Sequence, residues 1–247
     1  MYPILFRIGS FPVYGYGVLL AVAFFVGVIG LTREGKKAGL SEERLLDMTL
    51  LIMVAAIVGS RILYILIELP AYLEAPLTIF NIRSGGLSFH GGLIAGIAVG
   101  LWYTRRHKMP QGKVADLVAP YLALGYAIVR IGCLLNGCCY GRQTDVSWAL
   151  PASYVDNAPR HPTQLYAFFA ALIIFAVLRW RKKYIRFHGQ LFIEFILYYS
   201  IYRFVVEGFR EVSSYVGFLT LGQAVSLVAA VAAFVVIRVW PMGRRRD

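Results

Sequence analysis

The sequence predicts an all-α integral membrane protein, a bundle of about seven transmembrane helices. Three observations support this prediction: 59% of the 247 residues are hydrophobic, only 15% are charged, and the mean hydropathy is +0.65. A helix needs about 20 mostly apolar residues to cross a bilayer, and apolar stretches of this length recur along the chain. They leave no separate soluble domain, so we predict a single transmembrane domain over residues 1–247.

The predicted spans are each long enough to cross a membrane with some tilt. They cover residues 14–32, 47–68, 86–104, 115–136, 163–180, 189–209 and 217–240. We find no internal repeat, so the inverted-repeat signature of many transporters is not evident. A single helical bundle is therefore expected.

The positions of the basic residues predict the orientation. Of the 25 Lys and Arg residues, 17 lie in connecting segments on one side of the spans, five lie on the other side and three lie inside spans. An excess of Lys and Arg marks the cytoplasmic side. We therefore predict an N-terminus outside and a C-terminus in the cytoplasm. Because the basic residues form short clusters at the ends of apolar runs, the net charge of +12 does not indicate nucleic-acid binding.

This orientation places the unusual polar residues in one layer near the outer face of the membrane. They come from several spans and the turns beside them: Tyr14, His90, Arg130, Asn136, His161, Arg203 and Glu207. The cytoplasmic side has nothing comparable beyond its basic clusters. The outer layer is therefore the predicted site.

Arg130 and Arg203 are the strongest signal in this layer, because a guanidinium inside a bilayer is unfavourable unless it is partnered. Snorkelling to the interface would explain one such arginine. Two on different helices at one depth favour an anion site, with a lipid phosphate as the anion. Glu207 lies four residues after Arg203, on the same helix face, and is expected to hold it.

Arg61 lies within the second span and favours a structural interpretation. We expect its guanidinium to face the bundle and to bind backbone carbonyls or a carboxylate such as Glu194.

His90 lies in a glycine-rich segment, residues 84–96, where small residues indicate close helix packing. A histidine inside a span is often a bonded core residue. This one shares a layer with two arginines, and an imidazole suits proton transfer near neutral pH.

The three cysteines, Cys133, Cys138 and Cys139, lie in one short segment. No second pair of ligands at a recognisable spacing accompanies them, so the spacing predicts no metal site. In an oxidising compartment Cys133 would pair with Cys138 or Cys139 and leave one thiol over. Small structural residues or a loop disulfide are favoured over catalysis, because the C-x-x-C form of thiol oxidoreductases is absent.

Residues 161–166, His-Pro-Thr-Gln-Leu-Tyr, indicate a loop that enters the fifth span, with Pro162 suited to a first helical turn. The polar side chains would line a headgroup pocket or cap the helix.

Taken in order, several segments resemble the prolipoprotein diacylglyceryl transferase family over nearly the whole chain. They are Tyr14-Gly15, Gly59 to Tyr64, His90 to Ile94, Arg130 to Gly141, His161 to Tyr166 and Tyr202 to Arg210. The resemblance implies a seven-helix enzyme of the bacterial plasma membrane that faces outward. Such an enzyme moves the diacylglyceryl group of phosphatidylglycerol to the lipobox cysteine of a prolipoprotein, releases glycerol phosphate and needs no cofactor.

The same resemblance implies roles for individual residues. Arg130 would bind the phosphatidylglycerol phosphate together with Arg203, Asn136 and Gly141. His90 would be the catalytic base, with Arg203, Glu207 and Tyr14 as further catalytic residues. The chemistry agrees, because a thiol of pKa near 8.5 must lose a proton to attack, and a departing phosphate gains negative charge that arginines stabilise.

The chain departs from the family signature at two cysteines. Cys133 stands where the signature has asparagine, and Cys138 where it has glutamate. Either this is a cysteine-bearing branch with the same reaction, which we favour, or a paralogue with a changed acceptor. A transporter of anionic lipid and a thiol or quinone oxidoreductase are the alternatives from other classes. The sequence leaves the lipoprotein substrates, the oligomeric state and the peptide entry route open.

Overall fold

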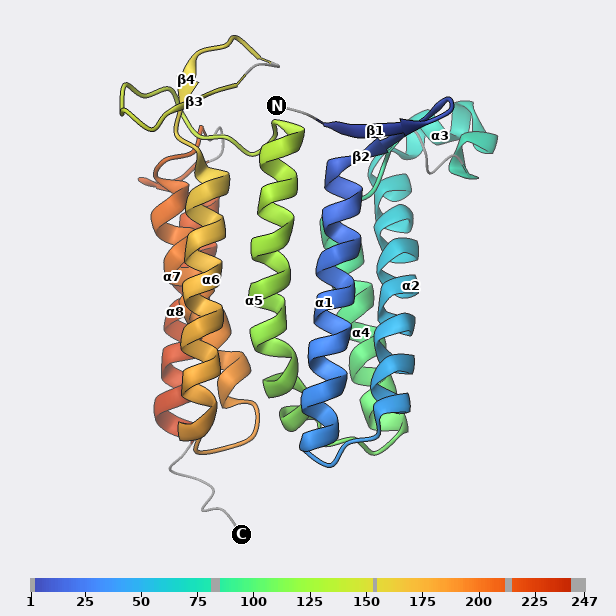
Figure 1. Ribbon diagram of the computed structural model, residues 1–247, viewed down its shortest axis with the longest axis vertical. Helices are drawn as coiled ribbons and strands as arrows, with labels where there is room; N and C mark the ends of the chain where they lie inside the picture. Colours follow the sequence, from blue (N-terminus) through green and yellow to red (C-terminus); the bar gives the residue numbers. More distant parts are fainter. Residues whose placement is uncertain (1–2, 81–84, 153–154, 212–214, 241–247) are drawn as a thin grey trace. The chain divides into compact units, whose positions relative to one another are not determined.

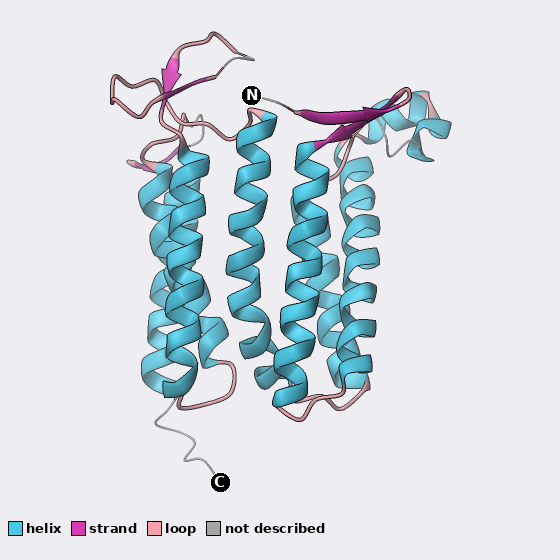
Figure 2. Ribbon diagram, in the orientation of Figure 1, coloured by secondary structure: helices cyan, strands magenta, loops and turns pink. Residues whose placement is uncertain are grey.

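A computed structural model describes residues 3–80, 85–152, 155–211 and 215–240, and helices dominate it (Figure 2). Within these ranges seven helices have 18 or more residues. They are α1 Gly15–Lys37, α2 Glu42–Ile67, α4 Phe89–Arg106, α5 Gln111–Asn136, α6 Thr163–Arg181, α7 Gln190–Glu207 and α8 Leu221–Val239. Each overlaps one of the predicted spans.

The helix that contains the second predicted span begins five residues before residue 47. Helix α2 begins at Glu42, because Ser41 caps it by accepting a hydrogen bond from the Arg44 amide at 3.3 Å. Two glutamates in the first turn, Glu42 and Glu43, also favour a helix N-terminus. Hydropathy alone misses such a polar first turn.

Five of the long helices are apolar enough, by length and composition, to cross a membrane: α1, α2, α5, α8 and the segment Thr163–Tyr184 that contains α6. Helix α7 carries three charged residues, Glu194, Arg203 and Glu207, and α4 ends in Arg105 and Arg106. The structure is therefore that of a mostly helical membrane protein. The count of seven crossings and the orientation of the termini stay predictions.

Short elements join the helices, and the all-α prediction did not include the strands among them. Three antiparallel hairpins pair β1 Ile4–Ile8 with β2 Phe11–Tyr14, β3 Leu150–Pro151 with β4 Pro159–Arg160, and β5 Tyr215–Val216 with β6 Leu219–Thr220. Within the described residues the other short elements are α3 Leu69–Glu74, η1 Pro76–Phe80 and η3 Lys182–Tyr184. Strands of two to five residues are too short for an alternating pattern to reveal them.

The chain forms two compact units, one of residues 1–31 with 112–247 and one of residues 32–111. In the second unit α2 and α4 lie side by side (Figure 1). Their backbones approach closely where Gly59 faces Gly91, since a methyl group on Gly91 would overlap the Gly59 carbonyl oxygen and lie 2.6 Å from Leu63 Cβ. Paired glycines therefore set the distance between these helices.

Arg61 of α2 is buried in the second unit and binds backbone carbonyls. Its guanidinium donates to Thr78 O at 2.8 Å, Ile79 O at 3.0 Å, Gly85 O at 2.9 Å and Gly86 O at 3.1 Å. The prediction of a structural arginine bonded to carbonyls is confirmed. Glu194, the other proposed partner, instead forms an ion pair with Arg181 at 2.6 Å.

In the first unit, α6 packs on α7 and α7 on α8 (Figure 1). Ala123 of α5, Ile174 and Leu178 of α6 and Leu191 of α7 form a buried apolar cluster. Asp116 of α5 accepts hydrogen bonds from three amides at the start of α7, of which Gly189 is the nearest at 2.7 Å. This carboxylate satisfies amides that a helix N-terminus leaves without partners.

We predict that Gly91→Ala lowers the stability of the fold by roughly 1–3 kcal/mol, because an added methyl group must push α2 from α4. Thermal unfolding in detergent, followed by size-exclusion chromatography, measures the change. Gly96→Ala on the same helix is the matched control, since its methyl group would meet only Ile52 Cγ2 at 3.5 Å. Equal melting temperatures for the two variants would contradict the packing argument.

Candidate functional site

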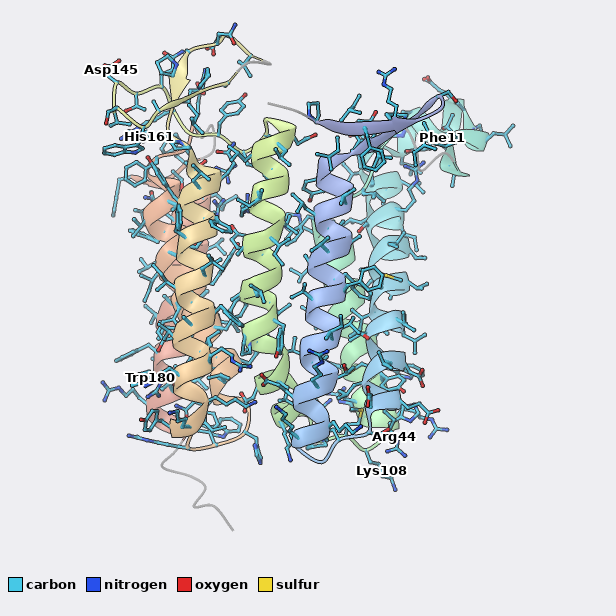
Figure 3. All side chains as sticks on the ribbon, in the orientation of Figure 1. Phe11, Arg44, Lys108, Asp145, His161 and Trp180 are labelled. Carbon is cyan, nitrogen blue, oxygen red and sulfur yellow. The ribbon has the colours of Figure 1, made fainter. Side chains whose placement is uncertain are left out.

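Four helix ends meet at one end of the first unit. The C-termini of α5 and α7 lie beside the N-termini of α6 and α8, and the hairpin β3–β4 lies next to them (Figure 1). His161 and Asp145 mark this end, whereas Trp180 marks the opposite end of α6 (Figure 3). Arg130, Asn136, Gly141, His161, Arg203 and Glu207 all belong to this unit and lie at or near these ends.

Arg130, in the last two turns of α5, has weak partners for a guanidinium. Its Nη1 lies 3.9 Å from Cys133 Sγ, and its Cζ lies 4.4 Å from the centroid of the Tyr126 ring. Its Nε is buried, and among the described residues it has no hydrogen-bond partner. A ring face and a sulfur stabilise a cation far less than a carboxylate does. Arg130 is therefore left able to bind a further anion.

Arg203 and Glu207, on the last turns of α7, form the predicted ion pair at 2.8 Å. Glu207 is buried and also lies 3.9 Å from Arg210 Nε. Its carboxylate packs on α8 at Gly222, where a methyl group would overlap Glu207 Oε1. One buried carboxylate thus holds two arginines, and a glycine on the next helix makes room for it.

Three tyrosines connect α5 with α7 between the arginines. The hydroxyl groups of Tyr126 and Tyr202 are 3.3 Å apart, and the Tyr126 ring packs edge-on against Tyr199 at 5.4 Å. Arg130 lies over the Tyr126 ring at 4.4 Å, and Arg203 directly follows Tyr202 on α7. The two arginines that the sequence singled out therefore belong to one site.

The charges of this site do not balance. Arg130, Arg203 and Arg210 carry three positive charges, and Glu207 is the carboxylate that pairs with them in the described part of the chain. The surplus is two positive charges at neutral pH. Such a site, partly shielded from water, favours an anion with one or two negative charges.

Gly141 lies in a segment clamped between two loops. Its amide donates to His161 O at 2.9 Å, and the next amide, of Arg142, donates to Phe209 O at 2.9 Å. A methyl group at Gly141 would overlap the Phe209 carbonyl oxygen and lie 2.8 Å from His161 Cβ. Glycine is therefore required here by close packing.

His161 is buried, and its Nδ1 lies 3.1 Å from the Tyr166 hydroxyl. Trp148 Nε1 donates to the same hydroxyl at 2.8 Å, and Phe209 packs edge-on against the imidazole at 5.0 Å. Burial, with a smaller effect of the Arg142 charge, lowers the pKa of His161 below its usual value. The imidazole is thus a neutral, bonded residue of the loop at neutral pH.

Arg160, which precedes His161, has a structural role that was not predicted from the sequence. It forms ion pairs with Glu211 at 2.6 Å and with Asp156 at 2.8 Å, and its side chain is buried. Hydrogen bonding to Arg160 lowers the pKa of Asp156. Arg160 therefore ties the loop before α6 to the loop after α7, and no local pattern indicates a pair 51 residues apart.

The remaining predicted residues differ in how the structure places them. Asn136 is the last, exposed residue of α5. Tyr14 ends β2 with 53% of its side chain exposed, whereas Tyr16, two residues on, packs on Gly132 of α5. His90 belongs to the second unit, where it is exposed in the first turn of α4. Tyr16 was not predicted, and no local signal distinguishes it from its neighbours.

The three cysteines are free, and their sulfur atoms lie within 4.8 Å of one another at the end of α5. The loop disulfide, one of two interpretations that the sequence left open, is therefore not formed in this structure. The linear spacing did not indicate that all three thiols meet.

Residues 3–239 match the family described as prolipoprotein diacylglyceryl transferase. The chain belongs to this family. Among its relatives are proteins named phosphatidylglycerol–prolipoprotein diacylglyceryl transferase from Bacillus cereus, Bacillus thuringiensis subsp. konkukian and Bacillus anthracis. Each is 36% identical over 246 residues, which cover 94% of this chain and 90% of the relative.

Membership of the prolipoprotein diacylglyceryl transferase family covers every residue of the candidate site, because the match runs from residue 3 to residue 239. The family resemblance found from the sequence is confirmed. The roles of the individual site residues stay predictions.

We predict that Gly141→Ala disrupts the loop between α5 and α6, because the methyl group would displace backbone at Phe209. Limited proteolysis would then cut residues 137–162 faster than in the parent protein. Gly17→Ala, where a methyl group would meet nothing within 4 Å, is the control. A cleavage rate at the control level would contradict the packing assigned to Gly141.

We predict that His161 makes stability depend on pH. The folded protein has a lowered His161 pKa, so between that value and about 6.5 the unfolded chain binds more protons. The free energy of unfolding therefore rises with pH across this window and levels off above about pH 6.5. Melting temperatures from pH 5 to 8 should show this slope in the parent protein and a smaller slope in His161→Gln. Identical slopes of melting temperature against pH in the two proteins would contradict the assignment of this pH dependence to His161.

Proposed function

We propose that this chain transfers the diacylglyceryl group of phosphatidylglycerol to the lipobox cysteine of a bacterial prolipoprotein, forming a thioether and releasing glycerol phosphate. Two findings support the proposal. The chain belongs to a family with that name, and its site holds three arginines against one carboxylate. The surplus of positive charge is the observation that most directly supports the proposal, because both the phospholipid substrate and the released glycerol phosphate carry a phosphate group.

The surplus charge fits the course of the reaction. Phosphatidylglycerol is a phosphodiester with one negative charge, and cleavage of the glyceryl carbon–oxygen bond leaves a monoester with up to two. Arginines that bind the departing phosphate more tightly than the diester lower the barrier, since they act on charge that develops in the transition state. Arg130, whose described partners include no carboxylate, is the proposed phosphate ligand, assisted by Arg203.

The other residues that the sequence singled out receive supporting roles in this proposal. Glu207 orients Arg203, and Asn136 and Gly141 bind the headgroup. Tyr14 supports catalysis. His90 accepts the proton of the acceptor thiol, a role that rests on the family resemblance.

We further propose that all seven long helices cross the bacterial plasma membrane, with the N-terminus and the site on the outer side. The excess of basic residues in the predicted cytoplasmic segments supports this orientation. In the first unit, Arg179 and Arg181 end α6 and Arg238 ends α8, away from the site. An outward site meets an exported precursor, so prolipoprotein signal peptides and phosphatidylglycerol are the proposed partners.

The test is a transfer assay with purified protein, a synthetic lipobox peptide and phosphatidylglycerol, read by mass spectrometry. We expect the peptide to gain one diacylglyceryl group. Arg130→Gln should lower kcat/KM by at least about 100-fold, because it removes a charged donor to the departing phosphate. His90→Gln should lower kcat.

Arg7→Gln, an exposed arginine on β1, is the matched control and should retain full activity. If several peptides gain no mass in the presence of the wild-type protein, the proposed acceptor is wrong. If Arg130→Gln is as active as the control, the phosphate role of Arg130 is wrong.

A further inference from the structure

The three thiols at the end of α5 form a compact cluster of metal-ligating groups. Their sulfur atoms lie within 4.8 Å of one another, Cys133 is buried, and Cys138 and Cys139 are partly buried. Two of them, Cys133 and Cys138, stand where the family signature that this segment resembles has an asparagine and a glutamate. The mechanism proposed above uses none of them.

The backbone at the end of α5 explains why the thiols meet. Gly137 adopts the left-handed conformation with φ 69°, its amide donates to Leu134 O at 3.2 Å, and the Cys138 amide donates to Cys133 O at 3.1 Å. These two bonds define a Schellman motif, which brings the third-last residue of a helix against the second residue beyond its cap. In this chain those two positions are Cys133 and Cys138.

Cys139 completes the cluster in an unfavourable conformation. Its φ of 64° is in the left-handed region, which a residue with a side chain occupies at a cost of about 1 kcal/mol or more. Hydrogen bonds from α6 hold this segment in place. Thr163 Oγ1 donates to Cys139 O at 2.5 Å, and Gln164 Nε2 donates to Cys138 O at 2.7 Å. Both donors are buried, so the thiols are held by a rigid frame.

The donor set and the surrounding charge select the ion. Three sulfur ligands favour Zn²⁺ or Cu⁺ over hard cations, and three protein ligands with one open position are typical of catalytic zinc. Tetrahedral bonds of about 2.3 Å put sulfur atoms about 3.8 Å apart, and the three sulfur atoms here all lie within 4.8 Å of one another. Zn²⁺ with three thiolates would carry one negative charge, and Arg130 Nη1 lies 3.9 Å from Cys133 Sγ. With this charge included, the three arginines and Glu207 would still leave one positive charge for the phosphate.

We propose that Cys133, Cys138 and Cys139 hold one Zn²⁺ ion as thiolates and leave its fourth position open to an external thiol. The spacing of the cysteines along the sequence predicted no metal site, and this proposal takes the place of that prediction. We identify the external thiol as the lipobox cysteine, and this identification rests on the proposed function. The site lies beside Arg130, the proposed phosphate ligand, so a thiolate bound there would be adjacent to the bond that breaks.

The chemistry of this step balances without any redox change. The acceptor thiol gives its proton to a base and binds as a thiolate. A sulfur electron pair then forms the carbon–sulfur bond, while the electron pair of the carbon–oxygen bond goes to the phosphate oxygen. The product thioether is neutral and leaves, because a thioether is a weaker zinc ligand than a thiolate. Zinc keeps its 2+ charge and its three cysteine ligands.

Cobalt substitution tests the site independently of activity. The reduced full-length protein in detergent is titrated with Co²⁺, which should bind once per chain and give near-ultraviolet sulfur-to-cobalt charge-transfer absorption. The visible bands should shift when a lipobox peptide is added, and should not shift with the same peptide carrying serine in place of cysteine. The triple variant C133S/C138S/C139S should lose the absorption, and His107→Gln, in the other unit, should keep it.

Chelation provides a second measurement that needs no variant. Removing zinc from the wild-type protein should lower transfer to the peptide at least tenfold, and Zn²⁺ should restore it. Failure of the reduced wild-type protein to bind cobalt or zinc would overturn the inference even if the thioether forms. Metal binding without thioether formation would support the site and would overturn the proposed function instead.

Discussion

A guanidinium inside an apolar bundle must find partners, and this constraint organises the structure. Arg61 binds four backbone carbonyls, Arg160 binds two carboxylates and Arg181 binds Glu194. Among the described residues, Arg130 contacts a ring face and a sulfur atom, and its Nε has no hydrogen-bond partner there. Because the cost of such a charge must be met, we propose that an external anion binds at Arg130.

Backbone packing keeps Arg130 and its neighbours in place. The Schellman turn at Gly137 ends α5, the amides of Gly141 and Arg142 join the loops before α6 and after α7, and Gly222 makes room for Glu207. Each of these contacts depends on a residue without a side chain or on a left-handed turn. The positive charge, the thiols and the loop that surrounds them are thus fixed by one set of helix ends.

Much of this could be predicted from the sequence. The helices follow from the length of the apolar runs, and the Arg203–Glu207 pair follows from a separation of four residues on a helix. The carbonyl partners of Arg61 follow from the cost of burying its charge. The meeting of the three thiols, the ion pairs of Arg160 and the contact of Tyr16 with Gly132 depend on tertiary structure, so local spacing could not indicate them.

The central claim is that the charge surplus around Arg130 selects an anionic lipid. Native mass spectrometry of delipidated protein, offered equal amounts of phosphatidylglycerol and zwitterionic phosphatidylethanolamine, tests it most directly. We predict that the wild-type protein and Arg7→Gln retain phosphatidylglycerol preferentially and that Arg130→Gln loses this preference. An unchanged preference in Arg130→Gln would contradict the account.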